Sequence, residues 1–220
     1  MGKWWSAGRT EDVQHEAPPI GRRERNKQQK LERITAAATE LFSRHGVDEV
    51  TTQQIADRAD VGTGTVFLYA KSKAELLLLV HNVKFADAIE TGVAAASGTP
   101  DQLGALMAIV RPIVHCNRVQ IENGRTYLRE LVFGDPEEPH HREGLALSAR
   151  VEAAFVDVLR RDERISEADA TELARAISAV MFISITATGY RTLSDEEVVG
   201  VIRDQVAVML GTRAERGDAR

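Results

Sequence analysis

Residues 51–69 constrain the fold most, because they carry the signals for two short helices joined by a tight turn. Thr51 stands three residues before Gln54, the spacing of a capping box that satisfies free backbone N–H groups in a first helical turn. The residues Asp60-Val61-Gly62 then interrupt the helical pattern, and Asp tolerates a left-handed backbone better than most residues. A second short helix is expected from about Thr63 to Tyr69. This arrangement is typical of a helix-turn-helix.

The turn leads into the tetrapeptide GTGT, residues 62–65, which also suggests a glycine-rich loop that binds nucleotide phosphates. A dinucleotide-binding fingerprint requires a third glycine where Phe67 stands, and a Walker A loop requires a lysine that neither glycine has after it. Both motifs also follow a strand, whereas the residues before Gly62 have a helical pattern. We therefore interpret GTGT as the first turn of a DNA-reading helix. Gly62 and Gly64 would let its backbone approach DNA closely.

The rest of the chain has helical periodicity and no alternating pattern of a β-strand, which predicts an all-α fold of about nine helices. Capping signals place helix starts after Ser72, Ser166 and Ser194. Gly46 is expected to end the first helix, and Pro112 to kink a later one. The expected helices cover about 26–45, 51–59, 63–69, 72–97, 101–119, 125–133, 141–161, 166–193 and 194–210.

Charge is distributed unevenly over the chain, whose net charge is −5. Residues 21–76 hold 10 Lys or Arg against 8 Asp or Glu, while residues from 77 onward hold 16 against 22. A weakly basic front on an acidic body suggests that only the front meets a polyanion, although a solvated helix face explains the charge as well. Without an apolar run of about 18 residues or a signal peptide, we expect a cytoplasmic protein that does not contact a membrane.

Four short motifs follow one another in residues 41–76: LFSRHG (41–46), TTQQIADRA (51–59), DVGTGTVFLYA (60–70) and SKAEL (72–76). Together they resemble the N-terminal DNA-binding domain of TetR-family transcriptional regulators. Four positions depart from the family pattern. Asp60 replaces a turn glycine, Gly62 a Ser or Thr helix cap, Phe67 a Tyr and Ala70 a Phe. Tyr69 stands where the family often has His, so its hydroxyl could restore a lost phosphate contact.

The resemblance implies an N-terminal three-helix helix-turn-helix domain and a C-terminal helical domain for ligand binding and dimerisation. We divide the chain into a disordered extension at 1–20, with Trp4 and Trp5 unexplained, a DNA-binding domain at 21–72, a ligand-binding and dimerisation domain at 73–213, and a flexible tail at 214–220. The implied partners are a near-palindromic double-stranded DNA operator, a second copy of the chain and an unknown small-molecule effector. The implied function is a repressor that its ligand releases from the operator.

The predicted site residues fall into three groups, and plain packing, capping or solvation is the alternative for each residue. The first group is expected to contact DNA, with an N-terminal arginine arm and lysines on phosphate and threonines on base edges: Arg22, Arg23, Arg25, Thr51, Gln53, Gly62, Thr63, Gly64, Thr65, Phe67, Tyr69, Lys71 and Lys73. The second would line a ligand pocket: His81, Phe85, Met107, His115, Cys116, Tyr127, Phe133, Phe155, Phe182 and Tyr190. The third would form the dimer interface: Leu173, Ile177, Val180, Val198, Val201, Ile202 and Met209.

Two other classes of protein stay open at this point. One is a helical interaction module with a degenerate helix-turn-helix, which would lack salt-dependent affinity for DNA. The other is a small helical enzyme, for which His115 beside Cys116 is the strongest feature. No third orienting group accompanies that pair, and the six histidines lack metal-ligand spacing. We therefore expect no catalytic residue, no metal and no cofactor.

Overall fold

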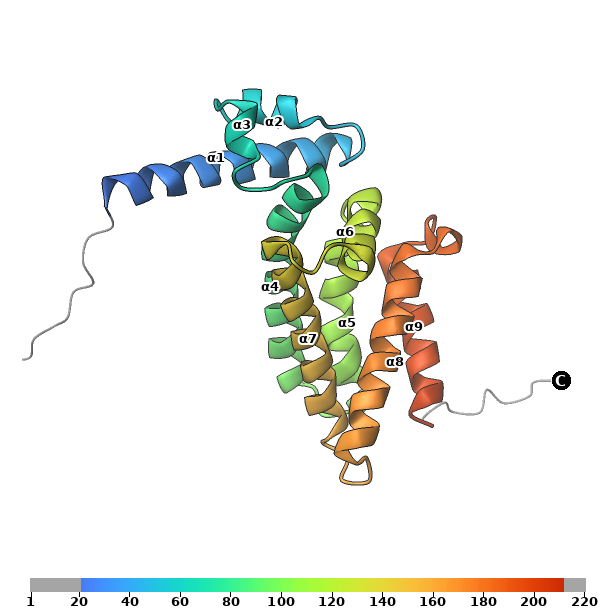
Figure 1. Ribbon diagram of the computed structural model, residues 1–220. Coiled ribbons are helices and arrows are strands. Elements are labelled where there is room, and N and C mark those ends of the chain that lie inside the picture. Colours follow the sequence, from blue (N-terminus) through green and yellow to red (C-terminus); the bar gives the residue numbers. More distant parts are fainter. Residues whose placement is uncertain (1–20, 212–220) are drawn as a thin grey trace, which may run out of the picture.

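The computed structural model describes residues 21–211, and this part of the chain is helical throughout, as the sequence predicts (Figure 1). The predicted extension at 1–20, with Trp4 and Trp5, and the predicted tail at 214–220 lie outside the described residues. The elements are α1 (Arg22–His45), α2 (Thr52–Arg58), α3 (Thr63–Val66), α4 (Lys73–Ser97), α5 (Gln102–Arg118), α6 (Ile121–Phe133), α7 (Pro139–Leu159), α8 (Glu167–Thr186), the 3-10 turn η1 (Thr188–Tyr190) and α9 (Asp195–Met209).

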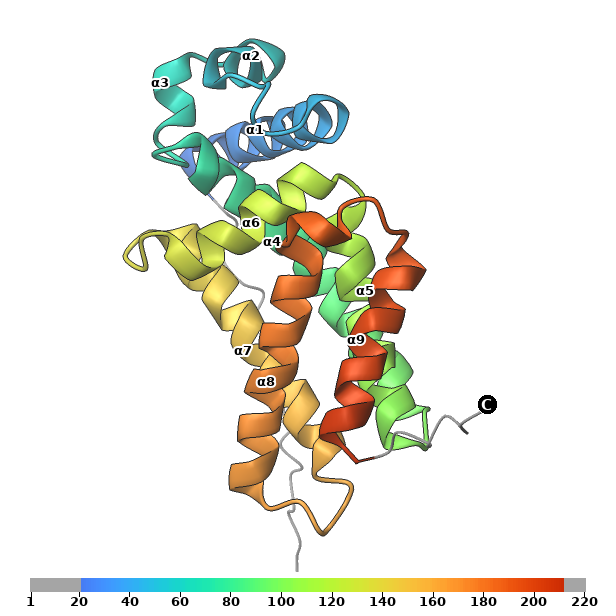
Figure 2. The same cartoon turned by 90° about the vertical axis from the view of Figure 1, so that its right-hand side faces the viewer.

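The helices form two groups that α4 connects (Figures 1 and 2). Helices α1, α2 and α3 lie together at one end of the molecule, and α4 runs from this group into a bundle with α5 to α9. Within the bundle α4 packs mainly against α5 and α7, while α8 packs on α7 and α9. None of the helices in residues 21–211 combines the length and apolar character that crossing a bilayer requires.

The first helix begins earlier than the sequence predicts, at Arg22 rather than at residue 26. Its apolar stripe is buried as expected, with Ile34, Ala38 and Phe42 inside the core. Gly46 ends the helix with a φ of 80°, a conformation that favours glycine. Arg22, Arg23 and Arg25, which are predicted to form an arm on DNA, belong to the first turn of α1, where the backbone N–H of Arg25 donates to Gly21 O. Their contact with DNA stays a prediction.

Side-chain caps account for the other helix boundaries, both those that the sequence predicts correctly and one that it misses. The hydroxyls of Ser72, Ser166 and Ser194 accept from backbone N–H groups three residues on, which confirms these helix starts. Helix α6 starts four residues before the predicted position, because Gln120, an unusual capping residue, accepts from Asn123 N at 2.8 Å. Helix α8 ends at Thr186 instead of near residue 193, since Arg125 Nε donates to the Thr186 carbonyl at 2.9 Å.

Candidate nucleic-acid interface and internal cavity

Helices α2 and α3 form a pair whose geometry is set by backbone hydrogen bonds. The capping box at Thr51 is present: Gln54 N donates to Thr51 Oγ1 at 3.2 Å, and Thr51 N donates to Gln54 Oε1 at 2.8 Å. Asp60 has a φ of 52°, the left-handed conformation that the sequence predicts. Around it Val61 N donates to Ala56 O at 3.0 Å and Asp60 N to Asp57 O at 3.2 Å, the two bonds of a Schellman motif.

Buried small residues allow α2 and α3 to pack closely. Ala56 and Val66 are fully buried where the two helices meet, and Ala70 is buried just beyond α3. Ala70 thus occupies the core, although it is much smaller than the phenylalanine that the TetR-family pattern usually has at this position. Helix α1 supports the pair: the carboxylate of Glu40, on α1, lies 2.7 Å from Nη2 of Arg58, on α2. The outer face of α3 is consequently presented on a fixed support.

The outer face of α3 is open and carries few interactions within the chain. A Cβ atom built at Gly62 or Gly64 would meet no atom within 4 Å, so internal packing does not require glycine at either position. Next to them Phe67 is 47% exposed and Leu68 is 82% exposed. The sequence reasoning missed Leu68. Leu68 follows buried Val66 by two residues, which places it on the opposite side of a helical turn, and this spacing predicts that its side chain is exposed.

The predicted polar contacts of α2 and α3 are linked to each other. Thr63 Oγ1 donates to Gln53 Oε1 at 2.6 Å, and Gln53 Nε2 donates to Asp57 Oδ1 at 2.7 Å. Thr63 and Thr65 are both half-buried. The side chains predicted to contact phosphate and those predicted to contact base edges are therefore neighbours on one surface.

Three predicted phosphate contacts have partners inside the chain. Tyr69 Oη donates to Lys27 O at 3.0 Å, and Lys73 Nζ donates to Asp48 O at 3.1 Å. Lys71 Nζ lies 2.7 Å from Glu138 Oε1, and this hydrogen bond raises the pKa of Lys71. Lys71 thus connects the end of the helix-turn-helix to α7 as well as carrying positive charge. Contact of these groups with phosphate stays a prediction.

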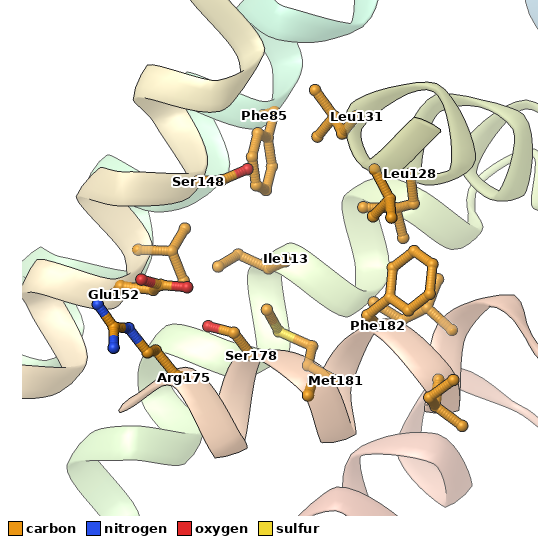
Figure 3. A pocket seen from close by; sticks show the side chains of 15 residues that line it. Phe85, Ile113, Leu128, Leu131, Ser148, Glu152, Arg175, Ser178, Met181 and Phe182 are labelled. Atoms are coloured by element: carbon orange, nitrogen blue, oxygen red, sulfur yellow. The ribbon is translucent and has the colours of Figure 1, made fainter. Parts of the chain in front are cut away.

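A cavity of about 450 Å³ lies between α4, α5, α6, α7 and α8 and is partly open to solvent, since Val132 and Ile183 in its lining are more than half exposed (Figure 3). Most of its lining is aliphatic or aromatic, which suits an apolar molecule. Only two of the ten predicted pocket residues, Phe85 and Phe182, line it. The lining is Phe85, Ile113, Leu128, Leu131, Val132, Ser148, Val151, Glu152, Arg175, Ser178, Ala179, Met181, Phe182, Ile183 and Ile185.

The other eight predicted pocket residues do not line this cavity, and their contact with a ligand stays a prediction. Met107 and Phe155 are buried elsewhere in the core, and Phe133 is 78% exposed at the end of α6. Tyr127 is fully buried, and its hydroxyl donates to Asn82 Oδ1 at 2.9 Å. Tyr190 lies in η1 and packs on the core from outside the cavity.

His81, His115 and Cys116 line a second cavity of about 490 Å³, bordered by α1, α4, α5 and α6. Burial lowers the pKa of His81 to about 4, and its Nε2 lies 3.2 Å from Asn117 Oδ1. Burial likewise raises the pKa of Cys116 to about 11. Neither group is ionised near neutral pH, and a thiol is a poor nucleophile. Within residues 21–211 no group of His, Cys, Asp or Glu side chains is placed to hold a metal ion.

The predicted dimer residues divide by burial. Ile177, Val198 and Ile202 are fully buried within the single chain, so the prediction that they contact a partner is wrong. Leu173, Val180 and Val201 are half-buried, and Met209 is exposed; their contact with a partner stays a prediction. The outward apolar side chains of α8 and α9 also include Ile183, which is 54% exposed, and Val208. The sequence reasoning did not single out these two.

Residues 21–211 are helical, a tight turn at Asp60 joins α2 to α3, and the outer face of α3 is exposed. These features define the class of helix-turn-helix DNA-binding proteins. Residues 34–80 match the family model described as bacterial regulatory proteins of the tetR family. The chain is also 27% identical over 193 residues to the HTH-type transcriptional repressor KstR of Mycolicibacterium smegmatis, covering 85% of this chain and 90% of that protein. Residues 34–80 therefore have the pattern of the DNA-binding domain of TetR-family transcriptional regulators, and the chain as a whole is similar to a repressor of this type.

Solved structures share the whole fold. Thermus thermophilus FadR, a TetR-family repressor in complex with lauroyl-CoA, aligns with a TM-score of 0.66 at 20% identity, over 86% of this chain and 98% of that one. The fatty acid degradation regulator FadR of Bacillus halodurans aligns with a TM-score of 0.60 at 15% identity, over 84% and 97%. At these identities the likeness concerns the fold.

Proposed function

We propose that this regulator is a repressor that leaves its operator when a largely apolar small molecule occupies the cavity between α4 and α8. The observation that supports this most is the joint between the two helix groups. Two walls of the cavity, α6 and α7, are hydrogen-bonded to the helix-turn-helix group. A change in the cavity can therefore alter the placement of α3. The name of the KstR relative, a transcriptional repressor, agrees with this direction of control.

The contact through α6 depends on Asn123. Its Oδ1 accepts from Val47 N at 2.7 Å, and its Nδ2 donates to Phe42 O at 2.8 Å. The two bonds connect the start of α6 to the end of α1 and the turn after it. Farther along the same helix Leu128 and Leu131 line the cavity. Movement of α6 by an occupant would thus act on the support of α2 and α3.

The contact through α7 involves the end of the helix-turn-helix. His140 Nε2 lies 3.0 Å from Tyr69 O, and Glu138 is paired with Lys71. The backbone N–H of His140 also donates to Glu75 Oε1 at 2.8 Å, near the start of α4. Helix α7 then continues to the cavity, where it contributes Val151. Both ends of the helix-turn-helix group therefore contact helices that line the cavity.

The proposed mechanism is a shift between two populations. A ligand that prefers a spacing of the two reading helices unsuited to DNA lowers operator affinity by its difference in affinity for the two states. We propose that residues 21–72 bind DNA and that residues 73–213 bind the effector and form a homodimer through the outward faces of α8 and α9. Two copies of α3 would then enter successive major grooves about 34–36 Å apart on a near-palindromic site.

Selection of bound DNA from a random pool tests the DNA half of the proposal. The expected result is a near-palindrome whose half-sites are about one DNA turn apart, with affinity that falls steeply as salt rises. Failure to enrich any sequence, together with no salt-dependent affinity, would favour the interaction-module alternative.

The dimer is tested separately by substituting one exposed apolar residue on α9 and one on α4. Val208→Glu should lower the dimer fraction in analytical ultracentrifugation without unfolding the chain. Val83→Glu, an exposed apolar position on α4, is the matched control and should leave the dimer intact. An unchanged dimer in Val208→Glu would place the interface elsewhere.

A further inference from the structure

A smaller cavity of about 260 Å³ lies where the helix-turn-helix group meets the bundle. Its walls come from the residues after α3, the start of α4, the end of α6, the loop that follows and the start of α7. It shares no lining residue with either cavity described above. We name it the junction cavity, and its ionisable lining is Lys71, Glu75, Glu130, Asp135, Glu138 and His141.

Acidic side chains dominate the lining of the junction cavity. Four carboxylates and one ammonium give it a formal charge of −3 when His141 is neutral. The carboxylate of Glu130 takes part in no hydrogen bond or ion pair within the described chain. Glu75 is only 4% exposed, and its Oε1 accepts from His140 N at 2.8 Å. Because buried carboxylates are costly unless positive charge or donors accompany them, the lining favours a cation.

The ammonium of Lys71 does not make this an anion site. Its Nζ lies 2.7 Å from Glu138 Oε1, and the side chain is otherwise largely exposed. The hydrogen bond and charge of Glu138, with smaller contributions from Asp135 and Glu75, raise the pKa of Lys71. An anionic ligand would have to compete with Glu138 for this ammonium and would meet the remaining carboxylates at close range, where like charges repel.

A buried ring nitrogen is independent evidence for a ligand. His141 is 3% exposed and lines the cavity, and its Nδ1 has no hydrogen-bond partner among residues 21–211. The other ring nitrogen, Nε2, lies 2.9 Å from the backbone oxygen of Glu130, which can only accept. Nε2 therefore carries the hydrogen, and Nδ1 is an acceptor in the neutral ring. A buried acceptor is destabilising until a donor reaches it, so the missing partner is a donor.

We infer that the junction cavity binds a small organic dication with N–H donors, an aliphatic diamine, through its carboxylates and the Nδ1 of His141. A metal ion does not meet the same requirements, because no group of His, Cys, Asp or Glu in the described part of the chain is placed to hold one. The carboxylates come from separate walls of the cavity, which suits a molecule with two cationic ends. Hydrogen bonds between ammonium and carboxylate groups are charge-assisted and therefore strong. The site is distinct from the effector cavity of the proposed function, and the inference does not rest on that function.

The test compares three molecules built on the same four-carbon chain. These are 1,4-diaminobutane, its fully N-methylated bis-quaternary analogue, which keeps the charge but has no N–H donor, and 1,4-butanediol, which has donors but no charge. Each is titrated into the full-length protein by isothermal titration calorimetry at pH 8 and constant ionic strength, where imidazoles are neutral and alkylammonium groups are protonated. The diamine should bind once per chain and at least about tenfold more tightly than either analogue. No saturable binding of the diamine, or equal affinities for the three, would overturn the inference.

Variants locate the binding. Glu130→Gln, which removes an unpaired charge from the lining, should weaken diamine binding at least several-fold. Glu137→Gln is the matched control, an exposed carboxylate in the adjacent loop outside the lining, and should change the affinity less than about twofold. Equal effects of the two variants would mean that the diamine binds elsewhere on the acidic surface and would overturn the site.

The role of the ring nitrogen is tested by His141→Phe. The ring shape is kept, and the Glu130 carbonyl retains its hydrogen bond from Gly134 N at 2.8 Å. This variant should also bind the diamine several-fold more weakly, with circular dichroism confirming that it is folded. Unchanged affinity in folded His141→Phe would overturn recognition by Nδ1.

Discussion

Replacing Asn123 with alanine should destabilise the joint between the cavity and the DNA-binding helices. The side chain makes two buried hydrogen bonds across the joint, one to Val47 N and one to Phe42 O. The Phe42 carbonyl also accepts from Gly46 N at 3.0 Å, so it keeps one partner in the variant. The N–H of Val47, a residue only 2% exposed, has no such second partner and becomes unsatisfied.

The expected cost follows from these two unequal losses. An unsatisfied buried N–H costs about 1–3 kcal/mol, and the lost bond to a carbonyl that keeps a partner costs about 0.5–1.5 kcal/mol. Asn123→Ala should therefore lower the free energy of unfolding by about 2–4 kcal/mol. This is a large fraction of the about 5–15 kcal/mol that is typical of a folded domain.

Urea unfolding followed by circular dichroism measures this cost, at one protein concentration because a dimer would make stability depend on concentration. With a slope of about 2–3 kcal/mol per molar, the midpoint should fall by about 1 M. Asn26→Ala is the matched control, since Asn26 is exposed on α1 and an exposed substitution usually costs under about 0.5 kcal/mol. If Asn123→Ala were no more destabilising than this control, the proposed joint would not hold the two helix groups together.

Three further predictions concern the reading helix and the second cavity. Gly64→Ala should raise the free energy of unfolding by up to about 1 kcal/mol in thermal unfolding, because the added Cβ meets no atom and alanine favours a helix. The same variant should bind the operator more weakly. The control Thr91→Ala, an exposed change on α4, should raise stability without lowering DNA affinity. Leu68→Ser should change the stability by less than about 0.5 kcal/mol but alter the base preferred at one operator position, and an identical selected motif would refute a contact by Leu68. Burial lowers the pKa of His81 from 6.5 to about 4, so the unfolded chain binds more protons than the folded chain between these pH values, and stability falls as pH falls through this window. His81→Gln should remove about 2 kcal/mol of the stability lost between pH 6.5 and about pH 5 in urea unfolding. An unchanged pH dependence of stability would show that His81 does not cause this loss.

The sequence by itself determined the features that depend on neighbours along the chain. Thr51, Ser166 and Ser194 predict helix starts because a cap needs only a side chain and a backbone N–H three residues away. Asp60 predicts the left-handed turn because that preference belongs to the residue itself. The order of these signals also carries the family resemblance, and with it the helix-turn-helix.

Only the tertiary structure decided which helix each buried face meets. Periodicity marks Phe155 and Phe182 alike as buried faces, but only Phe182 lines the cavity, since the outcome depends on the angle at which helices cross. For the same reason Ile177 is fully buried, whereas Ile183, six residues later on α8, lines the open part of the cavity and is 54% exposed. The carboxylates that line the junction cavity come from different helices and from the loop between α6 and α7, and no spacing along the chain reports that they meet there.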